Sequence, residues 1–400
     1  MSATCATQDR AMSSAVDLDA LVNRLEGILP STRPLSLYEP TFAGHEWDYV
    51  KACLDSGWAS SVGVFVDRLE QQLATYCGVS HAVAVVNGTA ALHVALMVLG
   101  VRRDEEVLLP ALTFVATANA IAYHDAIPHF IDVEERTLGV DAAKLADYLE
   151  AVAERREDGC YNRRSGRRLS ALIAVHTFGH PVDIEPLHLL CAHYGIPFIE
   201  DAAESLGSLY KGRHTGSFAR LAALSFNGNK IVTSGGGGAI LTDDPELAQQ
   251  VRHLTTTAKQ PHPWEYVHDQ IGYNYRLPSL NAALALAQLE QIESFVERKR
   301  RLAVRYREAL EGLEGLTLFR EPPFARSNYW LNALLLDDGD GAVRDELLAL
   351  THRVGILTRP AWRPMHEQAM YRHCPRMDLG VAEALVRRIV CLPSSVALQP

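Results

Sequence analysis

Short apolar segments alternate with longer helical segments over the first two thirds of the chain. Between about residues 36 and 245, runs rich in Val, Leu and Ile are separated by stretches with helical periodicity. Apolar strands that lack polar alternation and are separated by helices are typical of a mostly parallel sheet covered on both faces. We predict seven strands, at residues 83–86, 107–109, 130–133, 172–176, 197–200, 223–226 and 239–242. Helices are expected between them, for example at residues 90–99, 116–123 and 184–194.

The C-terminal third has a different pattern. Residues 281–313 read as one long, highly charged helical stretch, and a strand at 332–336 follows it. Two more helices are expected near residues 343–354 and 381–389. This part of the chain therefore predicts a smaller α+β domain.

We predict an α/β fold organised in three parts. Residues 1–35 form a polar tail and a short helix at 16–29, residues 36–275 form a large domain, and residues 276–400 form the small domain. The basic insert at 154–168 is expected to be a solvated surface loop.

Composition narrows the class of protein. Of the 400 residues, 48% are hydrophobic and 22% charged, which is typical of a globular protein and excludes disorder. The net charge of -10 argues against binding to nucleic acid or to an anionic membrane. Seven cysteines form no CxxC pair, and neither a signal peptide nor a membrane span is visible. These features predict a cytoplasmic protein.

Polar groups follow three of the predicted strands, at the sheet edge where α/β proteins bind ligands. Asn87-Gly88-Thr89 opens a helix, and the free N–H groups of a first helical turn suit a phosphate, although the same residues could simply cap the helix. Asp201 ends another strand and could hold a buried positive charge, or act only as a cap.

Lys230 stands out because only six of the 38 basic residues are lysines. It precedes the glycine run 235–238, which is not a Walker P-loop because no G-x-x-x-x-G-K-[ST] sequence is present. A lysine amine can form a Schiff base with an aldehyde, whereas a guanidinium cannot. A phosphate seat, a carboxylate and an amine are together what pyridoxal 5'-phosphate requires. Phe114 could cover the flat ring, or be an ordinary core residue.

Other chemistries are less well supported. His176 and His180 have the i, i+4 spacing of zinc ligands, but Gly179 and Pro181 place them in a loop, so we expect no metal. The G-x-S-x-G sequence of a Ser–His–Asp hydrolase is absent.

From about residue 35 to 393 the chain resembles the fold type I, pyridoxal phosphate-dependent sugar-nucleotide aminotransferases of the DegT family. Six motifs in order carry the resemblance: residues 87–92 (NGTAAL), 113–117 (TFVAT), 176–183 (HTFGHPVD), 200–204 (EDAAE), 225–230 (SFNGNK) and 272–276 (GYNYR).

The resemblance implies a role for each matching residue. Lys230 would be the Schiff-base lysine and the proton shuttle, and Asp201 would pair with the pyridine nitrogen. Ser225 would hold the phosphate together with Gly88 and Thr89, and Phe114 would stack on the ring. Asn274 would reach the phosphate of a neighbouring subunit, which implies a homodimer with shared active sites. Glu204 lies where many members have Gln or His near the cofactor's 3-hydroxyl, and its role is left open.

Further motifs resemble the branch that acts on UDP-linked 4-keto-6-deoxy-N-acetylhexosamines, which feeds bacillosamine and legionaminic acid type sugars in polysaccharide biosynthesis. They include residues 56–63 (SGWASSVG), 205–210 (SLGSLY) and 358–366 (TRPAWRPMH). The implied activity is transfer of the amino group of L-glutamate to the C4 ketone of the sugar. Candidate substrate contacts are Trp58, Ser60, Arg276, Arg359, Trp362, Arg363 and His366.

Two rival functions remain on the same fold. A pyridoxal phosphate-dependent deoxysugar dehydratase usually has His in place of the lysine, so Lys230 argues against it. A non-catalytic regulator would not need Asp201, Lys230 and the phosphate seat together.

Overall fold

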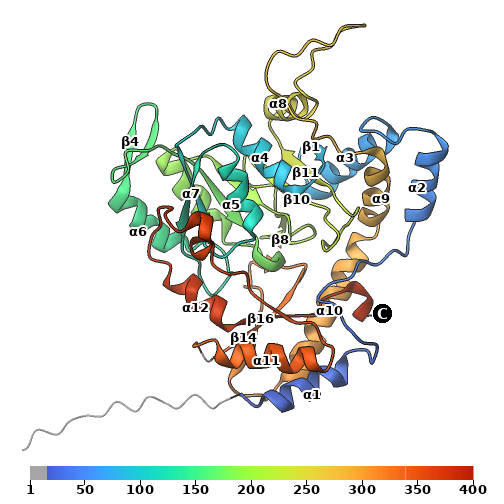
Figure 1. Ribbon diagram of the computed structural model, residues 1–400, viewed down its shortest axis with the longest axis vertical. Coiled ribbons are helices and arrows are strands. Elements are labelled where there is room, and N and C mark those ends of the chain that lie inside the picture. Colours follow the sequence, from blue (N-terminus) through green and yellow to red (C-terminus); the bar gives the residue numbers. More distant parts are fainter. Residues whose placement is uncertain (1–15, 338, 400) are drawn as a thin grey trace, which may run out of the picture.

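A seven-stranded sheet forms the centre of the computed structural model, which describes residues 16–337 and 339–399 (Figure 1). Its strand order is β1-β11-β10-β7-β6-β2-β3. Only β11 runs opposite to the others, so the predicted mostly parallel sheet is confirmed. All seven predicted strands are present: β1 (His81–Val85), β2 (Glu106–Pro110), β3 (Ile127–Ile131), β6 (Leu169–Val175), β7 (Phe198–Asp201), β10 (Leu221–Ser225) and β11 (Gly238–Thr242).

Helices cover both faces of this sheet. Val83 and Val85 pack into one buried cluster with α4 (Gly88–Val98), α5 (Val115–Ala122) and α8 (Pro245–Thr255). Ala82 and Ala84 pack into another with α3 (Val64–Cys77) and α9 (Ser279–Leu289). Further along that second face, α6 (Ala142–Val152) and α7 (Ile184–Tyr194) cover β2, β3 and β6. Because successive side chains of a strand point to opposite faces, both sets must be apolar, which explains the missing polar alternation.

The C-terminal part of the chain builds a second layer below the large sheet, coloured orange to red in Figure 1. Its antiparallel sheet has the order β12-β14-β16-β15. The N-terminal helix α1 packs against α10 and α11 there, in one buried cluster with the strands. The elements are α1 (Leu18–Ile28), α10 (Ile292–Leu310), α11 (Ala342–Arg353), α12 (Gly380–Arg388), β12 (Leu316–Leu318), β14 (Asn332–Leu336), β15 (Arg359–Pro360) and β16 (Ile389–Leu392).

The predicted tail at residues 1–15 lies outside the described residues, and the three-part division of the chain stays a prediction. The remaining short elements are α2 (Glu46–Asp55), β8 (Leu209–Tyr210), β9 (Arg213–His214) and β13 (Ala325–Arg326). Within residues 16–337 and 339–399, every helix is too short or too polar to cross a membrane.

The prediction of one long helix over residues 281–313 is wrong, because the chain forms two helices there. The first, α9, ends at Leu289 and the second, α10, begins at Ile292. The side-chain amides of Gln288 and Gln291 both donate to Glu46 Oε1, at 2.6 and 2.7 Å, which fixes this corner against α2. Residues 281–311 contain neither Gly nor Pro, so no helix-breaking residue in the sequence marks the break.

The insert at residues 154–168 is on the surface, but it is not the predicted loop. Strands β4 (Ala153–Arg156) and β5 (Gly159–Asn162) pair as a hairpin. The hairpin is anchored by Asn162, whose side-chain amide donates to the buried Glu106 carboxylate at 2.9 Å. Because the insert is rich in arginine, its sequence predicted a solvated loop and gave no sign of this buried contact.

Candidate active site

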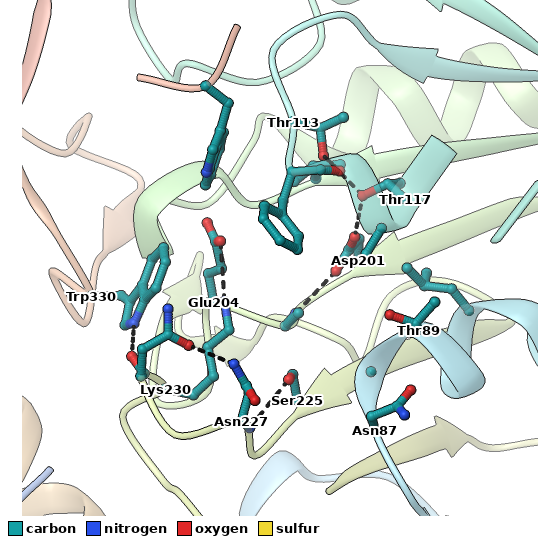
Figure 2. Close-up of a pocket in the computed structure, with 18 residues that line it drawn as sticks. Asn87, Thr89, Thr113, Thr117, Asp201, Glu204, Ser225, Asn227, Lys230 and Trp330 are labelled. Atoms are coloured by element: carbon teal, nitrogen blue, oxygen red, sulfur yellow. Dashed lines mark hydrogen bonds and ion pairs between the residues drawn. The ribbon is translucent and has the colours of Figure 1, made fainter. Parts of the chain in front are cut away.

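A cavity of about 350 Å³ lies at the carboxyl ends of β1, β2, β6, β7 and β10 (Figure 2). It brings together eight of the predicted site residues: Gly88, Thr89, Phe114, Asp201, Glu204, Ser225, Lys230 and Trp362. The other lining residues are Asn87, Leu92, Thr113, Ala116, Thr117, Val175, Ala203, Asn227, Asn229 and Trp330.

The first turn of α4 forms one end of the cavity. Asn87 caps this helix, since its Oδ1 accepts from Ala90 N at 2.7 Å. A Cβ atom on Gly88 would lie 2.9 Å from Ser225 Cβ, so only glycine lets the helix start approach the end of β10 this closely. The last glycine of the run 235–238 also allows the start of α4 to pack closely, because a Cβ on Gly238 would lie 2.9 Å from Gly88 N. The helix N-terminus and the hydroxyls of Thr89 and Ser225 thus form a seat suited to a phosphate.

Asp201 ends β7 and is 6% exposed. Its Oδ2 accepts from Thr117 Oγ1 at 2.9 Å and its Oδ1 from Ala203 N at 3.2 Å. Burial raises the pKa of Asp201, although the hydrogen bond from Thr117 and the charge of Lys230 oppose the rise. A cationic group bound in the cavity would stabilise this carboxylate.

Lys230 lies across the cavity, between Glu204 and Trp330 (Figure 2). Its Nζ is 3.2 Å from Glu204 Oε1 and 3.9 Å from the centre of the Trp330 ring. The indole also holds the lysine's own loop, because Trp330 Nε1 donates to the carbonyl oxygen of Asn229 at 2.7 Å. The amine is therefore held within the cavity, with its side chain 12% exposed.

Glu204 is buried beside the lysine. Its Oε2 accepts from Phe178 N at 2.9 Å. Phe178 has a φ of 57°, in the left-handed region that costs a non-glycine residue free energy. Burial raises the pKa of Glu204, and the positive charge of Lys230 opposes the rise. The structure thus places the Glu204 carboxylate in direct contact with Lys230, the candidate catalytic residue.

Aromatic rings form the wall on the outer side. The centre of the Trp362 ring is 6.2 Å from that of Phe114 and 4.9 Å from that of Phe178. Phe114 is 51% exposed, so it is not a core residue. Such a wall suits a flat ring or the face of a sugar.

The structure places seven predicted site residues outside this cavity: Trp58, Ser60, Asn274, Arg276, Arg359, Arg363 and His366. Trp58 is 60% exposed, the carbonyl oxygen of Ser60 accepts from Ser279 N at 2.7 Å, and Asn274 forms a β-bridge with Thr256.

The basic residues among these seven are divided between interior and surface. Arg276 is 7% exposed and pairs with Glu70 Oε1 at 2.7 Å. Arg363 pairs with Glu367 at 3.0 Å and His366 with Glu383 at 3.1 Å. Arg359 is exposed on β15.

Thr117 and Trp330 contact the key groups of the cavity but were not among the predicted site residues, although Thr117 lies in the 113–117 motif. Thr117 had a signal, because it lies four residues after Thr113 in a helix that follows a strand, and the two hydroxyls are 2.9 Å apart. Trp330 had none, because it lies 100 residues from Lys230 in the chain and in no motif of its own.

Pyridoxal phosphate fits this set of groups. The α4 end offers N–H groups and hydroxyls for a phosphate, buried Asp201 lacks a cation of its own at ion-pair distance among the described residues, and Lys230 supplies a held amine. Val175 and Ala203 give apolar lining between these polar ends.

Comparisons with known proteins agree with this fit. The sequence profile of the DegT/DnrJ/EryC1/StrS aminotransferase family matches residues 40–400. The chain is 38% identical over 366 residues to EpsN of Bacillus subtilis (strain 168), and the match covers 90% of this chain and 91% of that one. The name of EpsN assigns it to the pyridoxal phosphate-dependent aminotransferases. It is 36% identical over 351 residues to the GDP-perosamine synthase of Caulobacter vibrioides, covering 88% and 90%.

Solved structures match over nearly the whole chain. The aminotransferase TlmJ from Streptoalloteichus hindustanus has a TM-score of 0.82 at 29% identity, covering 91% of this chain and 94% of that one. S. venezuelae DesV, in complex with a ketimine intermediate, has a TM-score of 0.79 at 29% identity, covering 97% and 94%. The chain therefore belongs to the DegT/DnrJ/EryC1/StrS family of aminotransferases, with the fold type I architecture and pyridoxal phosphate as its cofactor.

Proposed function

We propose that this aminotransferase moves the amino group of L-glutamate to the C4 ketone of a nucleotide-linked 4-keto-6-deoxy sugar, giving a 4-amino-4,6-dideoxy sugar nucleotide. The observation that carries the proposal is the placement of Lys230 Nζ, 3.2 Å from Glu204, in one cavity with Asp201 and the start of α4. A regulator would have no use for a held amine there, and a dehydratase of this fold would lack it.

Each polar group has a separate task in this proposal. Bound pyridoxal phosphate supplies an aldehyde carbon that accepts the amine nitrogen and a ring that delocalises the electrons left at the substrate carbon. Asp201 holds the ring nitrogen in its protonated form, since a buried carboxylate favours a cationic partner. Lys230 Nζ takes the proton from the α-carbon of glutamate and later returns a proton to C4 of the sugar. Glu204 and Trp330 hold that amine in place between the two transfers.

The sugar is proposed from two sources. The motifs around Trp58 and Trp362 resemble the branch acting on UDP-4-keto-6-deoxy-N-acetylhexosamines. Relatives named GDP-perosamine synthase, from Caulobacter vibrioides, Vibrio cholerae and Escherichia coli O157:H7, are 34 to 36% identical and favour a GDP-linked sugar as the second candidate. In either case Trp362 offers its ring, and the exposed Arg359 and Arg363 suit a diphosphate.

The proposed assembly is a homodimer with shared sites. Large apolar side chains are exposed in two segments, at 58–64 and 264–271, and the second projects from the top of the molecule in Figure 1. They are Trp58, Val62, Val64, Trp264, Tyr266, Val267 and Ile271. Exposed apolar groups of this size are typical of protein interfaces. Asn274, outside its own chain's cavity, is proposed to reach the phosphate in the partner.

A mixing experiment tests the shared site. Lys230→Ala and Asn274→Ala chains should each be inactive alone. After mixing and exchange, activity should return to about a quarter of the wild-type value, because each hybrid dimer has one site with both residues intact. No recovery in a mixture shown to contain hybrids would overturn the shared site while leaving the chemistry untouched.

The function itself is tested by assaying amino transfer from L-glutamate to UDP-linked and GDP-linked 4-keto-6-deoxy sugars, with product configuration read by NMR. Lys230→Ala should abolish turnover on whichever sugar the wild type accepts. Lys51→Ala is the matched control, since Lys51 is exposed and pairs with Asp55 on the same helix. Undiminished turnover by the Lys230→Ala variant, or no turnover of any nucleotide sugar by the wild type, would contradict the proposal.

A further inference from the structure

A second cavity, of about 340 Å³, lies between α10 and β13 and shares no residue with the active-site cavity. We call it the arginine pocket; its lining residues are Glu297, Arg300, Arg301, Val304, Arg307, Arg326 and Tyr329. Four arginines and one acidic residue, Glu297, thus line this cavity, in a chain whose net charge is -10.

Three of these four cations are not neutralised. Arg300 is neutralised by Glu321, with nitrogen–oxygen distances of 2.8 and 2.6 Å. Throughout residues 16–337 and 339–399, no side chain or carbonyl forms an ion pair or hydrogen bond with the guanidinium groups of Arg301, Arg307 or Arg326. Unpaired like charges held together repel one another, so an anion between them would stabilise the arrangement.

One donor in the arginine pocket is withdrawn from water as well as unpaired. Arg307 Nε is buried and has no hydrogen-bond partner among the described residues. A buried N–H without an acceptor costs stability. The hydrogen-bonding capacity of the Arg307 guanidinium is therefore left unfilled by the described residues.

The frame of the arginine pocket is rigid. Arg300 and Arg307 lie seven residues apart on α10, which places them on the same side of the helix, two turns apart. Arg326 comes from β13, whose pairing with β8 fixes it opposite. Arg300 is held by the carbonyl oxygen of Ser327 at 2.7 Å in addition to Glu321.

We propose that the arginine pocket binds the phosphate or diphosphate group of a small molecule, at a site separate from the active site. The planar guanidinium fork matches the oxygens of a phosphate, and three unpaired forks match more than one phosphate group. The proposal does not depend on the identity of the sugar substrate.

The test is calorimetric titration of the holoenzyme, whose own phosphate seat is filled by the cofactor. Inorganic phosphate, inorganic diphosphate and a nucleoside diphosphate are titrated separately, up to about 5 mM. Diphosphate should bind wild type, and Arg307→Gln and Arg326→Gln should each weaken that binding by about tenfold or more. Arg163→Gln is the matched control, because it removes the same charge from the exposed β4–β5 hairpin region.

Hydrogen exchange gives a second readout that does not depend on the variants folding equally well. Diphosphate should slow exchange in the wild-type segments around residues 300–307 and 325–329. Absence of diphosphate binding to wild type would overturn the proposal. So would equal binding by the Arg307→Gln, Arg326→Gln and Arg163→Gln variants, or protection confined to the active-site loops, since each places the anion elsewhere.

Discussion

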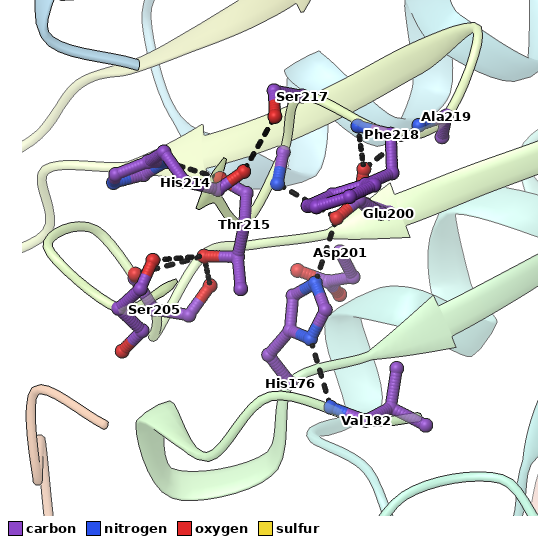
Figure 3. Close-up of polar contacts among 12 residues, drawn as sticks. His176, Val182, Glu200, Asp201, Ser205, His214, Thr215, Ser217, Phe218 and Ala219 are labelled. Carbon is purple, nitrogen blue, oxygen red and sulfur yellow. Dashed lines mark hydrogen bonds and ion pairs between the residues drawn. The ribbon is translucent and has the colours of Figure 1, made fainter. Parts of the chain in front are cut away.

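Glu200 and Asp201 are neighbours on β7, yet their carboxylates lie on opposite faces of the sheet and are satisfied differently. Glu200 is fully buried and surrounded by donors (Figure 3). Its Oε1 accepts from Gly216 N at 2.7 Å and from His176 Nε2 at 3.1 Å, and its Oε2 accepts from two backbone N–H groups, both at 2.9 Å. His176 Nδ1 accepts from Val182 N, which leaves Nε2 as the ring nitrogen that faces Glu200.

The pKa values of the two groups move in opposite directions. Burial acts to raise the pKa of Glu200, but the hydrogen bonds from His176 and the backbone outweigh it and the pKa falls below its ordinary value. Burial also acts on Asp201, which accepts two hydrogen bonds from the residues that the structure describes, and the pKa of Asp201 rises. A carboxylate that the protein satisfies fully stabilises the fold, whereas one left short of donors at a cavity is available to a ligand.

Replacing Asp201 should have the largest effect. Asp201→Asn keeps the shape and the contact with Thr117 but removes the charge that holds a protonated ring nitrogen. We expect the rate of amino transfer to fall by about 10²-fold or more, measured in single turnovers with glutamate. A rate within about twofold of wild type would contradict the claim that the charge of Asp201, unlike that of Glu200, serves the chemistry.

Replacing Glu200 should affect the fold and leave the chemistry largely intact. In Glu200→Gln one carboxylate oxygen is replaced by an amide N–H group. The backbone N–H groups that donated to that oxygen then have no acceptor, so the free energy of unfolding should fall by about 2–4 kcal/mol. Urea denaturation measures the loss, and kcat per folded molecule should stay within about twofold of wild type. A large fall in kcat at unchanged stability would show that Glu200 belongs to the active site.

A smaller and sharper effect is expected in the pH dependence of the apoprotein's stability. Because the folded-state pKa of Asp201 is raised, its contribution to stability is lost as the pH rises above its ordinary value of 3.8. Asp201→Asn should therefore be more stable than wild type at pH 7, and this advantage should shrink toward pH 4. The contribution of Glu200 behaves in the opposite way: it is present above its ordinary value of 4.5 and is lost as the pH falls through its lowered folded-state pKa.

Denaturation of the three apoproteins at several pH values between 4 and 7 checks these signs. The gap between wild type and Glu200→Gln should be widest at pH 7. Parallel curves for the two variants would mean that the neighbouring carboxylates do not differ in the folded state.

The sequence was sufficient to predict the seven strands and the residues at their ends. Strands buried on both faces leave runs of apolar residues, and the carboxyl ends of parallel strands meet at one edge, so Gly88, Asp201 and Lys230 could be placed together from their order alone. The alternation along β7 also implies that Glu200 and Asp201 point apart.

What the sequence could not supply depends on contacts between distant segments. Trp330 reaches Lys230 only because β14 and its preceding loop fold back under the large sheet, and no local pattern marks that return. The four donors around Glu200 come from two separate segments, one containing His176 and one at 216–219. The break between α9 and α10 is set by Glu46, more than 200 residues earlier, so periodicity alone predicted a continuous helix.

Reduction of the wild-type holoenzyme with borohydride, followed by peptide mapping, tests the central claim most directly, because it shows which of the six lysines holds the cofactor. We predict one pyridoxyl group per chain, on Lys230, and loss of that label in the Lys230→Ala variant. A label on another lysine, such as the buried Lys299, or no label at all, would contradict the assignment of this cavity as the active site.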